Sequence, residues 1–596
     1  MDVLHVIGYT VGILFVTVYL LEAYLHWRRR PLIKLMKSIR KIGRNMPVVG
    51  HIWLMWGKLE HALYTAEKLV RHYGQDGNFA VWIVDRVYVV LVKPEDLALT
   101  LGSPHFISKS TEYTIMQSSI MGQGLFSVTD VNEWRKNRKL ITPAFHFQIL
   151  KTFIDNFHME SKILIDNVRN QMDNNGEVEV HRFIGLCTLD MITKNAMGVT
   201  VEAQKNSTHV FVQGMETVLH VWYMRIISPW LLSNAIFSLT SLKTRHDTAM
   251  RGVQAFATQV ILEKLEARHL AATSVSPVVS GQEEDDAFCR SRNTRAFLDL
   301  LIDTAYEGVD QRRMACLIAS LRRQKDAQHE PGFWARLRGG FGRGRKPLAD
   351  KRETAERDTN NNADCGATQV DGEEDAALER VTCQLRDEVV TIMVGGQETT
   401  ACENSFAILM LALHQDVQRK VTTELAEIFG SDCRPPSYDD LQRMAYLECV
   451  IKETMRLFPA LPVMARVAQQ NTTLSDNSFL PKGCTVVAFI YSLHRDPRYF
   501  PEPNRFWPER FLPENSGNRH PYSYIPFAAG ARNCIGQKYA MLQMKTILST
   551  VLREFRILPS QKMPNMDSIR LLMTSTLRSK TGCWVRLQPR SSSSSA

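Results

Sequence analysis

The chain has 596 residues, of which 44% are hydrophobic and 22% are charged, values close to those of ordinary globular domains. This composition excludes a largely disordered protein, and the length is compatible with one large enzyme core. The formal net charge of +10 suits a nucleic acid, an anionic membrane surface or an acidic protein partner, and does not choose among them.

The amino terminus begins with an apolar stretch over residues 3–21, about the length that a helix needs to cross a bilayer. Arg28, Arg29 and Arg30 follow it, so the positive-inside bias predicts a transmembrane anchor over 1–27 with everything after residue 28 in the cytosol. A cleaved secretory signal is the alternative. It is disfavoured because the basic cluster follows the apolar stretch and no A-x-A-like cleavage site comes after it.

A basic linker is predicted over residues 28–50, and the body begins at 51. Two runs of β-branched and apolar residues, 79–84 and 87–92, predict a hairpin. Residues 153–171 and 447–457 have helical periodicity, and 484–490 reads as a strand. These patterns predict a body that is mainly α with small β-sheets.

One stretch, residues 311–380, departs from this pattern. It changes from basic to acidic along its length and contains an Arg-Gly run at 336–346, so it is predicted to be a disordered insertion between two parts of one domain, 51–310 and 381–588. The Arg-Gly run could bind RNA or anionic lipid; a solvated loop or an unspliced stretch of the gene model is favoured over that interpretation. The tail at 589–596 is low-complexity serine.

Eleven cysteines occur without C-x-x-C spacing and in odd number, which argues against a disulfide framework and a structural zinc site. Cys534 differs from the rest because glycines lie on both sides of it, at Gly530 and Gly536. An iron-bound thiolate needs a rigid loop that presents the sulfur and lets a flat cofactor approach the main chain, and glycine permits both.

Three further features of this loop suit a haem-thiolate centre. Arg532 offers a fork of donors for a carboxylate such as a haem propionate, and Phe527 can exclude water. A helix predicted over 535–551 places the thiolate of Cys534 near a helix amino terminus, where the dipole favours negative charge.

The spacing F-x-x-G-x-R-x-C-x-G over residues 527–536 resembles that of the cytochrome P450 family. The resemblance implies the family's fold, a single large catalytic domain, and haem b bound non-covalently with Cys534 as the iron ligand. A second segment, Gly395-Gly396-Gln397-Glu398-Thr399-Thr400, resembles the family's distal-helix motif. The motif implies that Glu398 supplies protons from solvent and that Thr399 holds dioxygen and its water; a helix kink with a satisfied hydroxyl is the alternative.

Two more correspondences extend the resemblance. Glu453 and Arg456, with Arg510 further along, resemble the family's structural triad, which holds the cysteine loop in place. Trp134 and Arg138 match the W-x-x-x-R helix that meets a haem propionate.

Arg466 matches another propionate contact. Residues 134–147 and 494–511 resemble the corresponding segments of the microsomal family-four clan, of animal and arthropod-like type. Gly395 departs from this pattern, because many members of the clan carry at this position a glutamate that links to haem. No covalent haem link is therefore expected.

The function predicted from these motifs is an NADPH-dependent monooxygenase on the endoplasmic reticulum membrane. No G-x-G-x-x-G fingerprint lies in a βαβ context, so electrons are expected from a separate NADPH-cytochrome reductase, with cytochrome b5 as a second candidate donor. Fatty acids, hormone-like lipids and lipophilic foreign compounds remain open as substrates, and nucleic acid is disfavoured as a partner. The alternatives are a thiolate-haem isomerase or dehydratase acting on lipid hydroperoxides, and a non-catalytic haem protein whose insertion binds RNA or lipid.

Overall fold

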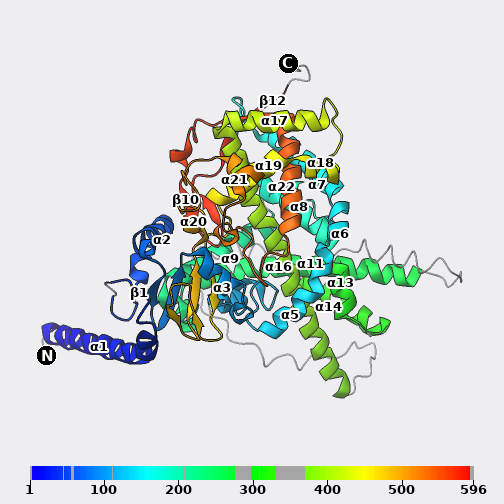
Figure 1. Cartoon of the computed structure of the whole chain (residues 1–596). Coiled ribbons are helices and arrows are strands. Elements are labelled where there is room, and N and C mark those ends of the chain that lie inside the picture. The colour runs from blue at the N-terminus through cyan, green and yellow to red at the C-terminus, as the bar shows by residue number, and fades with distance from the viewer. Residues whose placement is uncertain are drawn as a thin grey trace.

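The computed structural model describes residues 3–43, 46–55, 59–110, 112–205, 209–274, 297–307, 309–329 and 369–590. Most of these residues are helical, and four small sheets lie among the helices. The amino-terminal helix lies at one end of the molecule and the carboxyl terminus at the opposite end (Figure 1). The prediction of a mainly α fold with small β-sheets is confirmed.

The α-helices, in chain order, are α1 Val3–Leu35, α2 Leu59–Tyr73, α3 Pro94–Leu101, α4 Glu112–Met116, α5 Val131–Ile141, α6 Phe147–Thr152, α7 Ile154–Gln171, α8 Val180–Ile192, α9 Val210–Ile227, α10 Asn234–Ser238, α11 Ser241–Ser274, α13 Phe297–Ala305, α14 Gln311–His329, α16 Gln369–Leu413, α17 Gln415–Phe429, α18 Tyr438–Arg443, α19 Ala445–Leu457, α20 Ile490–Leu493, α21 Pro513–Ser516 and α22 Gln537–Glu554. The predicted helices at 153–171, 447–457 and 535–551 correspond to α7, α19 and α22.

The strands are β1 Arg40–Lys41, β2 Phe79–Ile83, β3 Arg86–Leu91, β4 Glu177–Glu179, β5 Met464–Val467, β6 Thr472–Thr473, β7 Phe479–Leu480, β8 Thr485–Ala488, β9 Phe555–Pro559, β10 Leu571–Met573, β11 Leu577–Ser579 and β12 Trp584–Pro589. The largest sheet has the order β1-β2-β3-β8-β5, and β4-β12-β9 form a second one. β2 and β3 pair as an antiparallel hairpin, as predicted, and β8 is the strand predicted near residue 484.

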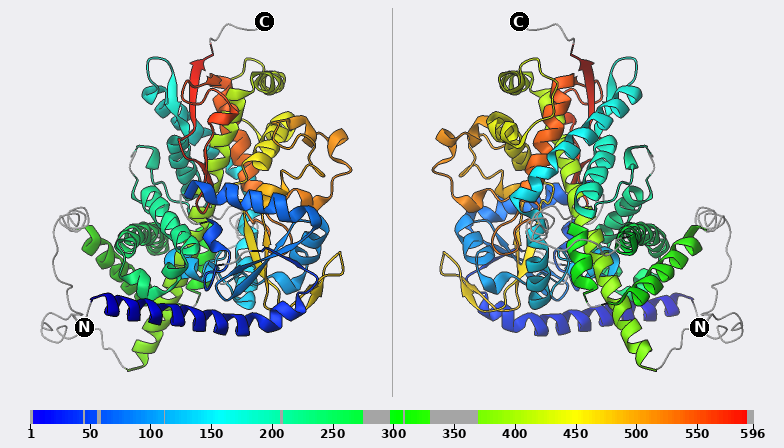
Figure 2. Two further views of the ribbon diagram at one scale, coloured as in Figure 1. Left: turned by 90° about the vertical axis from the view of Figure 1, so that its left-hand side faces the viewer. Right: turned by 90° about the vertical axis from the view of Figure 1, so that its right-hand side faces the viewer.

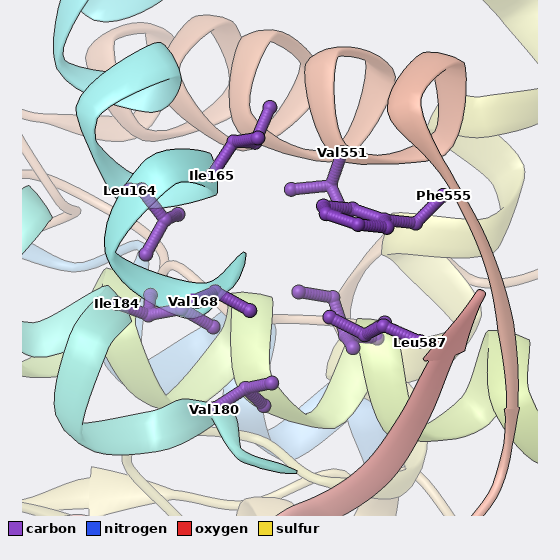
Figure 3. Close-up of a pocket in the computed structure, with 9 residues that line it drawn as sticks. Leu164, Ile165, Val168, Val180, Ile184, Val551, Phe555 and Leu587 are labelled. Atoms are coloured by element: carbon purple, nitrogen blue, oxygen red, sulfur yellow. The ribbon is translucent and has the colours of Figure 1, made fainter. Parts of the chain in front are cut away.

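The apolar core surrounds α16, the 45-residue helix that runs through the body. Residues 405–412 of α16 are all buried, and α8 and α22 pack against this helix. Between α7, α8, α22 and β12 the core keeps a cavity of about 20 Å³ with an entirely apolar lining (Figure 3). The core therefore holds α16 and α22 in contact with each other.

The amino-terminal helix is longer than the predicted anchor. α1 continues to Leu35, and its segment Tyr9–Leu32 has the length and apolar composition of a membrane span. Figure 2 shows α1 as a dark blue helix along one side of the molecule, next to the large sheet.

The predicted basic linker is ordered where it meets this sheet. Arg29 is buried because its guanidinium donates to the carbonyl of Val84 and lies 5.7 Å from the ring of Trp82. β1, which also belongs to the predicted linker, adds a parallel strand to β2. The linker prediction was therefore wrong for these residues, since they contribute to the body.

The predicted disordered insertion, 311–380, is wrong at both ends. Residues 311–329 form α14, because Met314, Leu317, Ile318 and Leu321 recur at helical spacing and face the core. At the other end, α16 begins at Gln369 and Leu378 packs against the core. The remainder of the predicted insertion, with its Arg-Gly run, and the serine tail beyond residue 590 lie outside the described residues.

Candidate active site

The loop that carries Cys534 is closed by its own backbone. The N–H of Cys534 donates to the carbonyl of Phe527 at 2.9 Å, and that of Asn533 donates to the carbonyl of Gly530 at 3.1 Å. Gly530 has a φ of +73°, and a Cβ there would collide with the carbonyl oxygen of Leu101. Glycine is required at this position for both reasons.

Cys534 lies just before α22, whose N-cap is Gly536. The thiol is solvent-accessible, yet the protein mass around it raises its pKa by desolvation, which the backbone N–H of Gly536 and the charge of Arg138 oppose. Unlike Gly530, Gly536 has a negative φ of −87°, and a Cβ there would lie 3.9 Å from the sulfur. The backbone of Gly536 is therefore one that any residue can adopt, and the lack of a side chain at this position leaves the space beside the sulfur free.

The W-x-x-x-R helix, α5, contacts this loop at two points. Arg138 donates to the backbone carbonyl and to the side-chain oxygen of Asn533, both at 2.9 Å. The buried ring of Trp134 lies 4.8 Å from the guanidinium of Arg532. The donors of Arg138 are thus directed at Asn533, the residue next to Cys534.

Lys109, Arg466 and Arg532 are three buried cations that lie near one another. Desolvation by burial, together with the charges of the two arginines, lowers the pKa of Lys109. In the part of the chain that the structure describes, no carboxylate lies within salt-bridge distance of any of the three. Nε and Nη1 of Arg532 are buried without a hydrogen-bond partner. Because buried charges need a counter-charge, this group of cations fits an anion with several carboxylate oxygens, such as the two propionates of haem.

The two glycines of the distal motif have different surroundings. A Cβ built on Gly396 would meet Cδ1 of Ile192 at 2.6 Å, so this glycine lets α16 and α8 pack closely. Gly395 has no atom within 4 Å of the corresponding position. The hydroxyl of Thr399, one turn further along, donates to the carbonyl of Gly395 at 2.7 Å. Gly395 and Thr399 therefore form the open face of α16.

Glu398 lies on the packed side of α16 and is buried in a network that the motif did not predict. Its Oε1 accepts from the hydroxyl of Thr576 at 2.7 Å and from Nη2 of Arg578 at 2.7 Å. Arg578 also donates to the exposed Glu216 at 2.6 Å. Burial raises the pKa of Glu398, but the charges of Arg578 and His181 outweigh it, so the net shift is downward.

The expected triad is assembled and almost fully buried. Arg456 donates to both oxygens of Glu453, at 2.7 and 2.8 Å, and Nε of Arg510 donates to Oε1 of Glu453 at 3.1 Å. The remaining donors of both arginines reach backbone carbonyls between residues 494 and 505. Each charge in this set has a partner within the protein.

His494 connects the triad to the cysteine loop. Its carbonyl accepts from Arg456 at 2.9 Å, and its Nε2 accepts from the N–H of Ile525 at 3.0 Å, two residues before Phe527. Burial, together with the positive charges of Arg456 and Arg495, lowers the pKa of His494 to about 3. The imidazole is therefore neutral at physiological pH and its Nε2 is available as an acceptor.

The motifs did not reveal several residues at this site. Thr576 and Arg578 come from the hairpin β10–β11 and reach α16 only in the fold. Lys109 stands in an irregular segment with no motif around it. Each of the three is a polar residue among other polar residues, which is too common to select a site residue from the sequence.

Comparison with known proteins agrees with this geometry. The family model described as cytochrome P450 matches residues 41–328 and 348–581. A human protein named cytochrome P450 4V2 is 31% identical over 556 residues, which cover 93% of this chain and 90% of the relative. The mouse protein of the same name is 32% identical over 93% of this chain and 90% of its own length, and cytochrome P450 4c3 of Drosophila melanogaster is 32% identical over 86% and 81%. The chain belongs to the cytochrome P450 family.

Proposed function

We propose that the chain inserts one oxygen atom of dioxygen into a fatty acid, a hormone-like lipid or a lipophilic foreign compound, with electrons that originate from NADPH. Its enzyme class and cofactor follow from the family: cytochromes P450 are monooxygenases whose haem iron is held by a cysteine thiolate. The observation that carries the proposal is the rigid loop that presents the accessible sulfur of Cys534.

The haem-binding residues are proposed on both sides of the cysteine loop. Cys534 is the iron ligand, and Arg466 and Arg532 are the partners of the propionates, because both are buried and neither has a carboxylate partner in the described parts of the chain. Trp134 and Arg138 hold the loop itself in position. Phe527 is half-buried against the core, and its carbonyl accepts from the N–H of Cys534, which places it to exclude water from the sulfur once haem is bound.

When bound, haem supplies the activation of dioxygen, and the protein must supply protons. The hydroxyl of Thr399 lies on the open face of α16, where it can hydrogen-bond to a bound molecule after leaving the carbonyl of Gly395. Oε1 of Glu398 accepts bonds from Thr576 and Arg578, which fixes the carboxylate and leaves Oε2 as the oxygen to exchange a proton. Glu216 is exposed at the surface end of the same network, so protons would pass between the network and solvent at this residue.

Electrons are proposed to come from a separate NADPH-cytochrome reductase, with cytochrome b5 as a further donor. The sequence has no dinucleotide fingerprint of its own, and a net charge of +10 suits an acidic partner as well as a membrane surface. The endoplasmic reticulum, with the catalytic domain in the cytosol, is the proposed location. The apolar segment Tyr9–Leu32 and the basic residues from Arg28 onward support it.

The absorption spectrum of the reduced, carbon-monoxide-bound protein tests the ligand assignment. The native chain is expected to give a thiolate-type band, and Cys534→His is expected to lose it. A thiolate-type band that persists in Cys534→His would overturn the assignment. Turnover that requires NADPH and reductase supports the monooxygenase, whereas product formation from a lipid hydroperoxide without either would favour the isomerase alternative.

A further inference from the structure

Glu403 of α16 is a buried acid with no basic side chain as a partner among the described residues. It is 7% exposed, and burial raises its pKa to about 8. Its Oε1 accepts from the backbone N–H of Ala460 at 2.8 Å, and its Oε2 is buried without a hydrogen-bond partner in the described parts of the chain. An acid in such surroundings keeps its proton at neutral pH, because an unpaired buried charge is costly.

Glu398, earlier on the same helix, has different surroundings. Its carboxylate accepts from Thr576 and forms an ion pair with Arg578, as described above. Glu403, in contrast, is held by a single backbone bond within an apolar stretch of α16. Because glutamate is almost never fully buried without a partner, its presence at this position needs a reason.

Ala460, the residue that donates to this acid, is connected to Glu398 through the hairpin β10–β11. The carbonyl of Ala460 accepts from the N–H of Leu577 at 2.9 Å. Leu577 is the first residue of β11 and is fully buried. Its two neighbours in the sequence, Thr576 and Arg578, are the donors to Glu398. These hydrogen bonds therefore form a closed path that begins and ends on α16.

The hairpin depends on attachments of this kind because it is short. β10 and β11 have three residues each and form a two-stranded sheet of their own, and an isolated two-stranded hairpin is only marginally stable. The segment after α19 is fixed to α16 by Phe458, whose ring stacks on that of Phe406 with 4.5 Å between the ring centres. The bond from Ala460 to Glu403 extends this attachment to the residue that receives the hairpin.

We propose that Glu403 is a positioning residue for Glu398: by holding Ala460 it fixes the hairpin β10–β11, and with it the two donors that orient the carboxylate of Glu398. The inference rests on the proposed part of Glu398 in proton supply. The property that matters is an acceptor at the end of a side chain of this length, and the proton of the acid is not required. A neutral side chain of the same length should therefore replace Glu403, whereas a shorter acid should not.

The test compares Glu403→Gln with Glu403→Asp, both as haem-loaded protein. Glutamine keeps the length and the acceptor but has no acidic proton, whereas aspartate keeps the proton and withdraws the acceptor by one carbon–carbon bond. Hydrogen exchange of the segment 571–579, measured by mass spectrometry, should be about tenfold faster in Glu403→Asp, since one buried hydrogen bond no longer opposes local opening. Glu403→Gln should exchange at the native rate.

The matched control is Glu424→Asp. Glu424 is a half-buried acid whose oxygens accept from the N–H groups of Tyr446 and Leu447, at 2.6 and 2.9 Å, at the start of α19. Its shortening weakens bonds of the same kind away from the hairpin, so exchange of the segment 571–579 should stay native.

A second measurement reports on Glu398. It is the share of NADPH electrons released as hydrogen peroxide, with the reductase present and dodecanoic acid as the probe. This share should rise at least about twofold in Glu403→Asp, because a displaced acid transfers protons less efficiently and dioxygen that is reduced without them in place leaves as peroxide. Glu403→Gln and Glu424→Asp should keep the native share.

Three outcomes would overturn the proposal. Native exchange in Glu403→Asp would show that Glu403 does not hold the hairpin, and a Glu403→Gln protein that resembles Glu403→Asp would show that the acidic proton is what matters. Faster exchange with a native peroxide share would show that the hairpin does not position Glu398. If Glu403→Asp does not fold, Glu403→Gln still decides the question. Failure of the proposed function is distinguishable, because the native protein would then consume no NADPH, while the exchange rates would still report on the hairpin.

Discussion

Two buried sets of charged side chains near the cysteine loop differ in how their charge is balanced. Glu453, Arg456 and Arg510 surround one shared carboxylate, and the other donors of the arginines end on backbone carbonyls. Lys109 and Arg532 lie in a set that contains only cations among the described residues. The first set is complete within the protein, whereas the second is complete only with an added anion. Loss of a charge should therefore affect folding in the first set and cofactor retention in the second.

The largest expected effect is in the triad, from Glu453→Gln. This change leaves Arg456 and Arg510 buried without a counter-charge, which costs about 3–5 kcal/mol of folding free energy. We expect a lower thermal midpoint and a small haem-loaded fraction in the expressed protein. The lower midpoint follows from the two unpaired charges, and the smaller haem-loaded fraction follows from weaker attachment of the cysteine loop through His494.

A matched control for this variant is Asp166→Asn in α7, where Asp166 and Arg169 have the same i, i+3 spacing but are 68% and 45% exposed. Exposed pairs contribute about 0–1 kcal/mol, so the control should remain close to the native midpoint. Equal midpoints for Glu453→Gln and the native protein would show that the triad does not stabilise the fold.

A smaller effect on the triad side is a dependence of stability on pH. The folded pKa of His494 is lowered to about 3, so between about pH 6.5 and pH 3 the unfolded chain binds a proton at this residue that the folded chain does not. Stability therefore falls as the pH falls through this window, by up to about 1.4 kcal/mol per pH unit from this group. Above pH 6.5 the imidazole is neutral in both states and contributes no dependence.

His494→Gln keeps an acceptor for the N–H of Ile525 and removes the titrating ring. Denaturation measured at pH 7, 6 and 5 should show a shallower slope for this variant than for the native protein. The same slope in both proteins would mean that the pH dependence arises from other groups, such as the half-buried His181, whose pKa is also lowered.

The balanced set and the cysteine loop were predictable because their signals are local. The closely spaced pair Glu453 and Arg456 lies on one helix, and the loop residues up to Cys534 follow one another in the sequence. The unbalanced set was only partly predictable: Arg466 and Arg532 matched family positions, but Lys109 reaches them through long-range folding that no local pattern encodes.

Two other outcomes show what limited the sequence interpretation. Glu398 was identified as an acid of the motif, but its partner Arg578 lies in a hairpin far along the chain, so its burial in an ion pair was not foreseen. The helix α14 was missed for a different reason, because its charge obscured an apolar stripe that includes Ile318 and Leu321. That stripe was readable from the sequence, whereas the partner of Glu398 was not.

The smallest expected effect lies away from both charged sets, in the apolar cavity of Figure 3, into which Val168 and Val180 point. Val168→Ile adds one methylene to this space, and a buried methylene contributes about 0.8 kcal/mol, less any strain in neighbouring side chains. The thermal midpoint should rise slightly, while haem retention stays native because no charge changes. Val450→Ile is the matched control: Val450 is fully buried in α19 outside the cavity lining, so its extra methylene should destabilise by about 1–3 kcal/mol. Equal losses of stability in the two variants would show that the cavity does not accept a methylene. A change of haem retention in Val168→Ile would show that packing alone can alter haem retention, and the contrast between the two charged sets would then not explain it.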